Sequence, residues 1–148
     1  MNNLKIDLEN FIVLNLQSTN KLKNELEKKE NEKHDQLKDI SLGIIDILDS
    51  FERVEENLIE RGMAKNEEVS KTMNRYKTIQ KKLLNLLQKY GISKIEFPEN
   101  RLIVGLCEVV EKEADSSRKN DEVISVVRSG YIRGKDLIRA AQIIIVKN

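Results

Sequence analysis

The fold of this chain is decided by residues Leu37–Leu58, LKDISLGIIDILDSFERVEENL, whose apolar positions recur in alternating steps of three and four. That spacing is the a/d seam of a coiled coil. The seam consists of Leu37, Ile40, Ile44, Ile47, Phe51, Val54 and Leu58. Ile45 and Leu48 widen the apolar stripe beyond a two-stranded seam, which favours a bundle. The stretch therefore predicts a long helix that packs against other helices.

Nothing in the preceding residues stops this helix. Residues 1–60 contain no proline and a single glycine, Gly43. Residues 27–36 are almost entirely polar, so they predict either a solvated, loosely paired helix or a frayed one. The simplest interpretation is one long helix over residues 1–60, serving as a coiled coil.

A second helix is predicted over residues 67–91. Residues 60–66 contain a glycine and an asparagine, as a connection between helices would. The apolar residues that follow recur at helical spacing and are Val69, Met73, Tyr76, Ile79, Leu83, Leu86, Leu87 and Tyr90. Gly91, just past the last of them, is the expected left-handed cap and the junction to the next domain. A single hairpin would leave the seam facing water, so we expect a homodimer whose two hairpins form a four-helix bundle.

Beyond Gly91 the apolar period changes from helical to two, which predicts a small β-domain over residues 92–148. Leu102–Val110 and Val123–Tyr131 are rich in β-forming residues, and Arg133–Asp136 is a turn candidate leading into the run Leu137–Val146. About four strands are expected. The fold class is therefore α+β, with two helices followed by a β-domain.

Charge and hydropathy exclude several classes of partner. The 26 Lys and Arg residues are balanced by 25 Asp and Glu, so no field of one sign recruits nucleic acid or an anionic membrane. The apolar run Phe11–Leu14 is too short to span a bilayer. The only cysteine, Cys107, cannot form an internal disulfide, which suits a reducing compartment. We expect a cytoplasmic protein without a membrane anchor.

No constellation of residues indicates catalysis, a metal or a cofactor. His34 is the only histidine and lies among charged residues, where a surface position is expected. Cys107 lies in an apolar segment and is expected to behave as a small hydrophobe. Gly130 and Gly134 do not form a phosphate-binding loop. The sequence predicts a protein that is not an enzyme and binds no metal or cofactor.

Three segments carry a resemblance. Residues Ser129–Ala141, SGYIRGKDLIRAA, are followed by the apolar pair Ile145 and Val146. Residues Ile45–Arg53 read IDILDSFER, and residues Leu86–Ile92 read LLQKYGI. They resemble, in order and spacing, the C-terminal signature, the end of the long helix and the helix-to-head junction of the GrpE family. That family comprises the nucleotide exchange factors of DnaK-class chaperones.

The chain also departs from the GrpE pattern in the β-domain. Where the family usually has F-D-P-x-x-H-E-A, residues Phe97–Gly105 read FPENRLIVG, and no histidine stands near Val104. The Gly-Arg of the C-terminal signature is replaced by Lys135-Asp136. These differences bear on which chaperone is served and on how strongly the β-domain binds it.

The resemblance implies a parallel homodimer that binds the nucleotide-binding domain of a DnaK-class chaperone through a β-domain and promotes ADP release. Arg139 matches the arginine associated with that contact, and Gly91 matches the junction glycine. On one continuous strand Leu137, Arg139 and Ala141 would share a face, so an exposed Arg139 would place all three outward as the partner-binding surface. The alternative is a structural coiled-coil adaptor whose β-domain binds a different protein.

Overall fold

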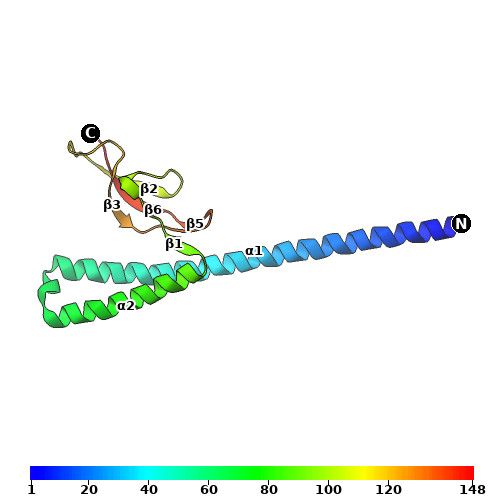
Figure 1. Cartoon of the computed structure of the whole chain (residues 1–148), viewed down its shortest axis with the longest axis horizontal. Coiled ribbons are helices and arrows are strands. Elements are labelled where there is room, and N and C mark those ends of the chain that lie inside the picture. Colours follow the sequence, from blue (N-terminus) through cyan, green and yellow to red (C-terminus); the bar gives the residue numbers. More distant parts are fainter. The chain divides into compact units, whose positions relative to one another are not determined.

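The structure is a computed structural model that describes residues 1–148 and comprises two compact units, Met1–Asp39 and Ile40–Asn148. Helix α1 (Asn2–Glu60) provides the whole of the first unit and the beginning of the second (Figure 1). The second unit continues with helix α2 (Glu67–Lys89) and the C-terminal strands. Two helices followed by a β-domain confirm the predicted α+β class.

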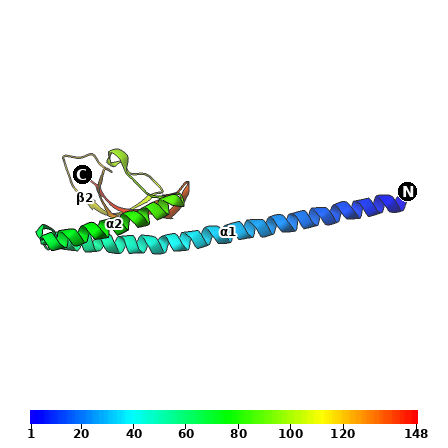
Figure 2. The ribbon, with the colours of Figure 1, turned by 60° about the horizontal axis from the view of Figure 1, so that its bottom comes forward.

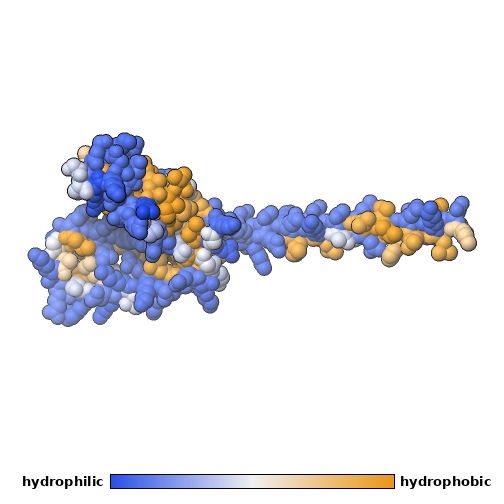
Figure 3. All heavy atoms as spheres, turned by 45° about the horizontal axis from the view of Figure 1, so that its top comes forward, coloured by the Kyte–Doolittle hydropathy of each residue, from blue (hydrophilic) through white to orange (hydrophobic).

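The first unit, Met1–Asp39, is helical from Asn2 onward, and its side chains are exposed apart from a few half-buried ones near its C-terminal end. The polar residues 27–36 are helical throughout, so of the two alternatives for this stretch the solvated helix is the one observed. Apolar side chains such as Leu4, Leu8 and Phe11 are exposed. Figure 3 shows separate patches of hydrophobic atoms among hydrophilic ones along this helix.

In the second unit, α2 lies alongside the C-terminal part of α1 and runs in the opposite direction (Figure 1 and Figure 2). The short 3-10 helix η1 (Met63–Lys65) makes the connection. Asn66 begins α2 because its side-chain Oδ1 accepts hydrogen bonds from the backbone nitrogens of Glu68 and Val69, at 3.0 and 3.3 Å. Gly91 ends it with φ +78°, the left-handed conformation expected of a glycine at this position.

The hairpin is held by side chains from both helices. The rings of Phe51 on α1 and Tyr76 on α2 pack with their centroids 5.6 Å apart. Lys77 Nζ on α2 forms an ion pair with Glu55 Oε1 on α1 at 2.8 Å. Part of the predicted seam is therefore used inside the chain.

The β-domain contains two three-stranded sheets. In the first, β4 (Tyr131–Arg133) lies between β1 (Ile92–Lys94) and β5 (Asp136–Arg139), and both pairs are antiparallel. In the second, β6 (Ala141–Val146) lies between β2 (Cys107–Glu113), which is parallel to it, and β3 (Val123–Arg128), which is antiparallel. A short 3-10 helix, η2 (Pro98–Asn100), follows β1.

The strand count differs from the predicted four, because six strands form. Residues 137–146, expected as one strand, are divided at Ala140 between β5 in one sheet and β6 in the other. The run of apolar residues hides this break, since both halves are suited to a strand. The strand expected at Leu102–Val110 lies further along the chain, at Cys107–Glu113.

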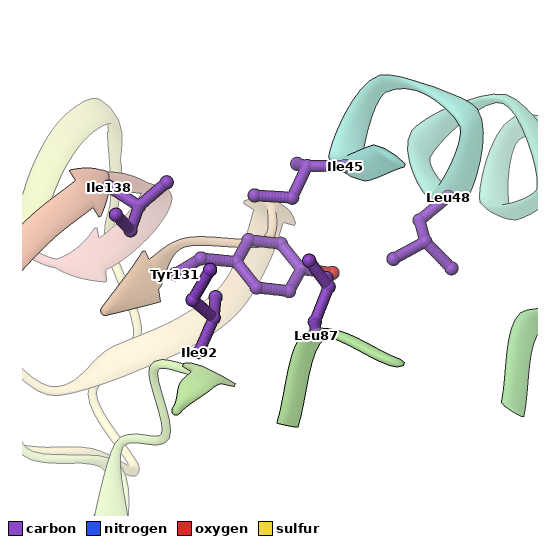
Figure 4. Close-up of a cluster of buried hydrophobic side chains, with 6 residues drawn as sticks. All are labelled: Ile45, Leu48, Leu87, Ile92, Tyr131 and Ile138. Atoms are coloured by element: carbon purple, nitrogen blue, oxygen red, sulfur yellow. The ribbon is translucent and has the colours of Figure 1, made fainter. Parts of the chain in front are cut away.

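Two clusters of buried side chains form the core of the second unit. One joins the helices to the first sheet and consists of Ile45, Leu48, Leu87, Ile92, Tyr131 and Ile138 (Figure 4). The other lies within the β-domain and consists of Val123, Ala141, Ile143 and Ile145, with Phe97, Leu102 and Cys107 packed against it. The β-domain therefore packs against α1 and α2 as part of one folded unit.

Candidate functional site

Arg139, the residue singled out by the resemblance, lies at the end of β5 and points its side chain at α1. Its Nη1 donates to Asp49 Oδ2 at 2.7 Å, and its Nη2 donates to Asp49 Oδ1 at 2.8 Å. Its Nε and Nη2 also donate to the backbone carbonyl of Ser129, at 3.1 and 2.6 Å. The guanidinium therefore holds a carboxylate in the bidentate geometry that gives arginine pairs their strength and direction.

A second arginine shares the same carboxylate. Arg128, the last residue of β3, donates from Nε to Asp49 Oδ2 at 3.0 Å and from Nη2 to Asp46 Oδ1 at 3.4 Å. Asp49 and Arg139 are largely removed from solvent, with side chains 6% and 13% exposed, whereas Arg128 remains 40% exposed. We call Asp49, Arg128 and Arg139 the Asp49 cluster.

The electrostatics of the cluster favour the ionised carboxylate. Burial raises the pKa of Asp49, but the hydrogen bonds and charges of Arg139 and Arg128 outweigh burial and hold the pKa below its ordinary value. Asp49 is therefore charged at neutral pH. It is stabilised there by two cations, so it is not a candidate proton donor or acceptor.

Tyr131 lies beside the cluster, with the guanidinium carbon of Arg139 5.7 Å from its ring centroid. Burial, and to a lesser degree the charge of Glu52, raises the pKa of Tyr131 to about 12, while Arg139 opposes this rise. The phenol oxygen is buried and has no hydrogen-bond partner. Figure 4 shows the ring inserted among the apolar side chains that join the β-domain to the helices.

The expectation that Leu137, Arg139 and Ala141 share one outward face is wrong. Leu137 is 37% exposed, but Ala141 is fully buried and belongs to a different strand, β6, in the other sheet. The side chain of Arg139 turns inward because the buried carboxylate of Asp49 draws it toward α1. Of the three residues, only Leu137 offers a substantially exposed side chain to a partner.

Sequence reasoning gave Asp49 and Arg128 no role, although Asp49 lies inside one of the three GrpE-like segments. A signal was present in the helical spacing. Asp49 lies four residues after Ile45 and eight after Ser41, on the face of α1 that is buried, so its charge needs a partner. Nothing comparable in the sequence singles out Arg128, because charged residues at strand ends are common.

The predicted dimer seam is only partly covered within the chain. Ile40, Ile47 and Val54 are 63%, 50% and 46% exposed. Leu37, Ile44, Phe51 and Leu58 are half-buried, and Ile44 packs against the cluster that includes Ile45 and Leu48. An apolar row therefore remains accessible on the face of α1 adjacent to the one that packs on the β-domain.

No group of three or more His, Cys, Asp or Glu side chains is arranged to hold a metal ion. Cys107 is half-buried, with its Sγ 3.2 Å from the carbonyl oxygen of Ile103. None of the helices combines the length and the hydropathy needed to cross a bilayer.

Comparison with known proteins supplies the family. The family model for GrpE matches residues 6–147, nearly the whole chain. This chain belongs to the GrpE family. No curated protein is similar enough to count as a match. The GrpE family consists of co-chaperones that act as nucleotide exchange factors of DnaK-class chaperones, not of catalytic enzymes.

Membership in the GrpE family extends the resemblance to residues that the three segments did not cover. The match begins at residue 6, so it includes most of the solvated part of α1 as well as the β-domain. Two of the GrpE-like segments, at residues 45–53 and 129–141, are physically joined, because the first supplies Asp49 and the second supplies Ser129 and Arg139.

Proposed function

We propose that this chain is a homodimeric nucleotide exchange factor that binds the nucleotide-binding domain of a DnaK-class chaperone and promotes ADP release. The observation that carries the proposal is the GrpE family match over residues 6–147, which includes most of α1, the whole of α2 and the β-domain apart from its last residue. The chain needs no catalytic group for this role, because the chaperone supplies the nucleotide site.

Exchange requires a difference in affinity between two states of the chaperone. A β-domain that binds an open nucleotide cleft more tightly than a closed one shifts the chaperone toward the open state, in which ADP is held weakly. By linkage, ADP weakens the hold of the exchange factor by the same factor. The side chains of this chain therefore act on the cleft walls and need not touch the nucleotide.

Dimerisation is proposed through the exposed row of the seam. Ile40, Ile47 and Val54 would meet the same residues of a second copy, and the half-buried seam residues would extend the contact along α1. Burial of this row supplies a driving force that the single chain leaves unused. The helix hairpin would then be one half of a four-helix bundle.

The test is the rate of ADP release from the DnaK-class chaperone of the same organism. Stopped-flow release of a fluorescent ADP analogue should accelerate as this protein is added and should saturate. Leu137→Asp tests which domain makes the contact, because it changes an exposed side chain of the β-domain outside the buried core. It should reduce the acceleration of ADP release if the β-domain contacts the chaperone. An unchanged release rate at saturating protein would contradict the proposal.

The structural adaptor remains the second candidate, and one observation favours it. The segment between β1 and β2, where the family usually carries a histidine, places Val104 at 89% exposure, so an apolar side chain stands on the surface there. A β-domain altered at this position suits a different partner. Failure to bind the chaperone at all would favour the adaptor.

A further inference from the structure

We propose that the Asp49 cluster is a clamp that fixes the β-domain in one orientation on α1, and that Arg139 is a positioning residue that influences partner binding only through this clamp. This inference rests on the proposed exchange function for its second half. The first half concerns the free protein alone. It changes the role of Arg139 from a surface contact to an internal link.

The hydrogen bonds of Arg139 leave little for a partner. Nε, Nη1 and Nη2 all donate within the chain, to Asp49 and to the carbonyl of Ser129. Nη1 also lies 3.9 Å from Asp46 Oδ1. A partner carboxylate would have to displace Asp49, leaving that buried charge with Arg128 alone.

The clamp grips the point at which the chain passes between the two sheets. Arg128 ends β3, Arg139 ends β5, and the carbonyl of Ser129 belongs to the link between β3 and β4. One carboxylate on α1 therefore holds residues from both sheets. If α1 rotated relative to either sheet, these hydrogen bonds would break and the buried charge of Asp49 would be left unpaired.

The backbone is tightly packed at this crossing point. A Cβ added at Gly130 would lie 2.4 Å from the backbone nitrogen of Ala141 and 2.8 Å from Ile95 Cδ1. The carbonyl of Gly130 accepts a hydrogen bond from Ile95 N at 2.9 Å, and Ala141 N donates to the carbonyl of Leu106 at 3.0 Å. A displacement of Ser129 or Arg139 would therefore shift the backbone of both sheets.

The clamp adds direction to a contact that is otherwise apolar. The cluster of Ile45, Leu48 and Tyr131 that joins α1 to the β-domain stabilises contact, but apolar burial has no preferred direction. Lys94 also pairs with Glu52 on α1 at 2.6 Å, but these side chains are 39% and 35% exposed, more than those of Asp49 and Arg139. A bidentate pair fixes the angle between its two planes as well as the distance.

A fixed orientation matters to a partner because a β-domain that samples several orientations binds only from the competent one. Its apparent affinity falls by the fraction of time spent in that orientation. The clamp removes this loss before binding. Substitutions in the clamp should therefore weaken binding and leave the exchange rate of the fully bound complex unchanged.

The first experiment measures hydrogen exchange in the free full-length protein. Asp49→Asn and Arg139→Gln should each speed exchange at the amides of Ile95 and Ala141 by roughly tenfold or more, because each leaves a buried partner unpaired. Asp39→Asn is the matched control: it is the same change on the same helix, at an exposed side chain, and it should leave exchange at these amides unchanged. Arg139→Lys, which keeps the charge but loses the fork, should give an intermediate rate even if Asp49→Asn does not fold.

The double variant Asp49→Asn with Arg139→Gln decides between a clamp and two separate contributions. A clamp predicts that the double variant exchanges no faster than the faster single variant, because the link is already broken. Additive increases in the exchange rate would overturn the clamp. Unchanged exchange rates at these amides in both Arg139→Lys and Asp49→Asn would also overturn it.

The second experiment titrates each variant into the chaperone and records both the half-saturating concentration and the maximal rate of ADP release. Asp49→Asn and Arg139→Gln should each raise the half-saturating concentration about tenfold and leave the maximal rate unchanged, and the double variant should raise that concentration no further. If the half-saturating concentration rose in Arg139→Gln but not in Asp49→Asn, Arg139 would contact the partner directly, and the positioning role would be overturned. If the unmutated protein itself fails to accelerate release, the exchange function fails, while the hydrogen-exchange result still decides the clamp.

Discussion

Within residues 40–60, α1 presents two neighbouring faces that the fold treats differently. One face carries Ser41, Ile45, Leu48 and Asp49, all buried against the rest of the unit. The adjacent face carries Ile40, Ile47 and Val54, all exposed. We call them the inner face and the seam face. The more regular heptad lies on the seam face, whereas the chain's own core lies on the inner face.

The difference shows that an apolar pattern indicates which residues need cover without saying what provides it. The inner face is covered by α2 and the β-domain, and it carries a charged residue because arginines from that domain neutralise it. The seam face carries only apolar residues at Ile40, Ile47 and Val54, as suits the interface of a coiled coil. The two faces therefore assign folding and self-association to different residues of one helix.

The largest effect is expected on the inner face. Ile45→Ala should lower the free energy of unfolding by about 4 kcal/mol, because it leaves a cavity beneath the β-domain. Chemical denaturation followed by circular dichroism measures this loss. Ile59→Ala, at an exposed position near the C-terminal end of α1, should change it by less than about 0.5 kcal/mol. If both variants lowered the free energy of unfolding equally, Ile45 would not lie on a buried inner face.

On the seam face, Ile47→Asp should weaken dimerisation roughly 100-fold while leaving each chain folded, because it places an unpaired charge in the contact. Ile47 is a cleaner choice than Ile44, which also packs against the core. Light scattering after size exclusion should show the mass falling to that of one chain, with circular dichroism preserved. Ile59→Asp is the control and should stay dimeric. A monomeric unmutated protein at micromolar concentration would refute the seam.

Acid should act on the inner face through Asp49. The folded-state pKa of Asp49 is lowered, so its stabilising contribution is complete above the pKa of an unfolded aspartate and is lost as pH falls through the folded value. Between about pH 5 and pH 2 the unmutated protein should lose about 2 kcal/mol more stability than Asp49→Asn, since hydrogen bonds to charged groups are worth that much. Denaturation at one protein concentration across this range measures the difference. Parallel curves for the two proteins would show that Asp49 is not held by its arginines.

The smallest expected effect has the opposite sign. Tyr131→Phe should raise the free energy of unfolding by about 1 kcal/mol, because it removes a buried hydroxyl that has no hydrogen-bond partner. Thermal denaturation detects such a change as a higher Tm. Tyr90→Phe, at an exposed position, serves as the control. A loss of stability in Tyr131→Phe would mean that the hydroxyl is satisfied in solution.

The sequence alone determined the order and type of the elements. The 3.6-residue period of two stretches separated by Gly62 and Asn66 predicted both helices, and the change of period after Gly91 predicted the β-domain. These features are local, since each depends on residues within a few positions of one another. The GrpE-like segments were also readable from the sequence, because they are contiguous.

Only the tertiary structure decided which apolar stripe is buried within the chain and where Arg139 points. Asp49 and Arg139 are 90 residues apart in the sequence, and no local spacing relates them. The strand break at Ala140 places Arg139 and Ala141 in different sheets, because β5 and β6 pair with different strands. Such pairings are set by packing across the whole unit, so the same residues that predict a strand cannot by themselves predict its partners.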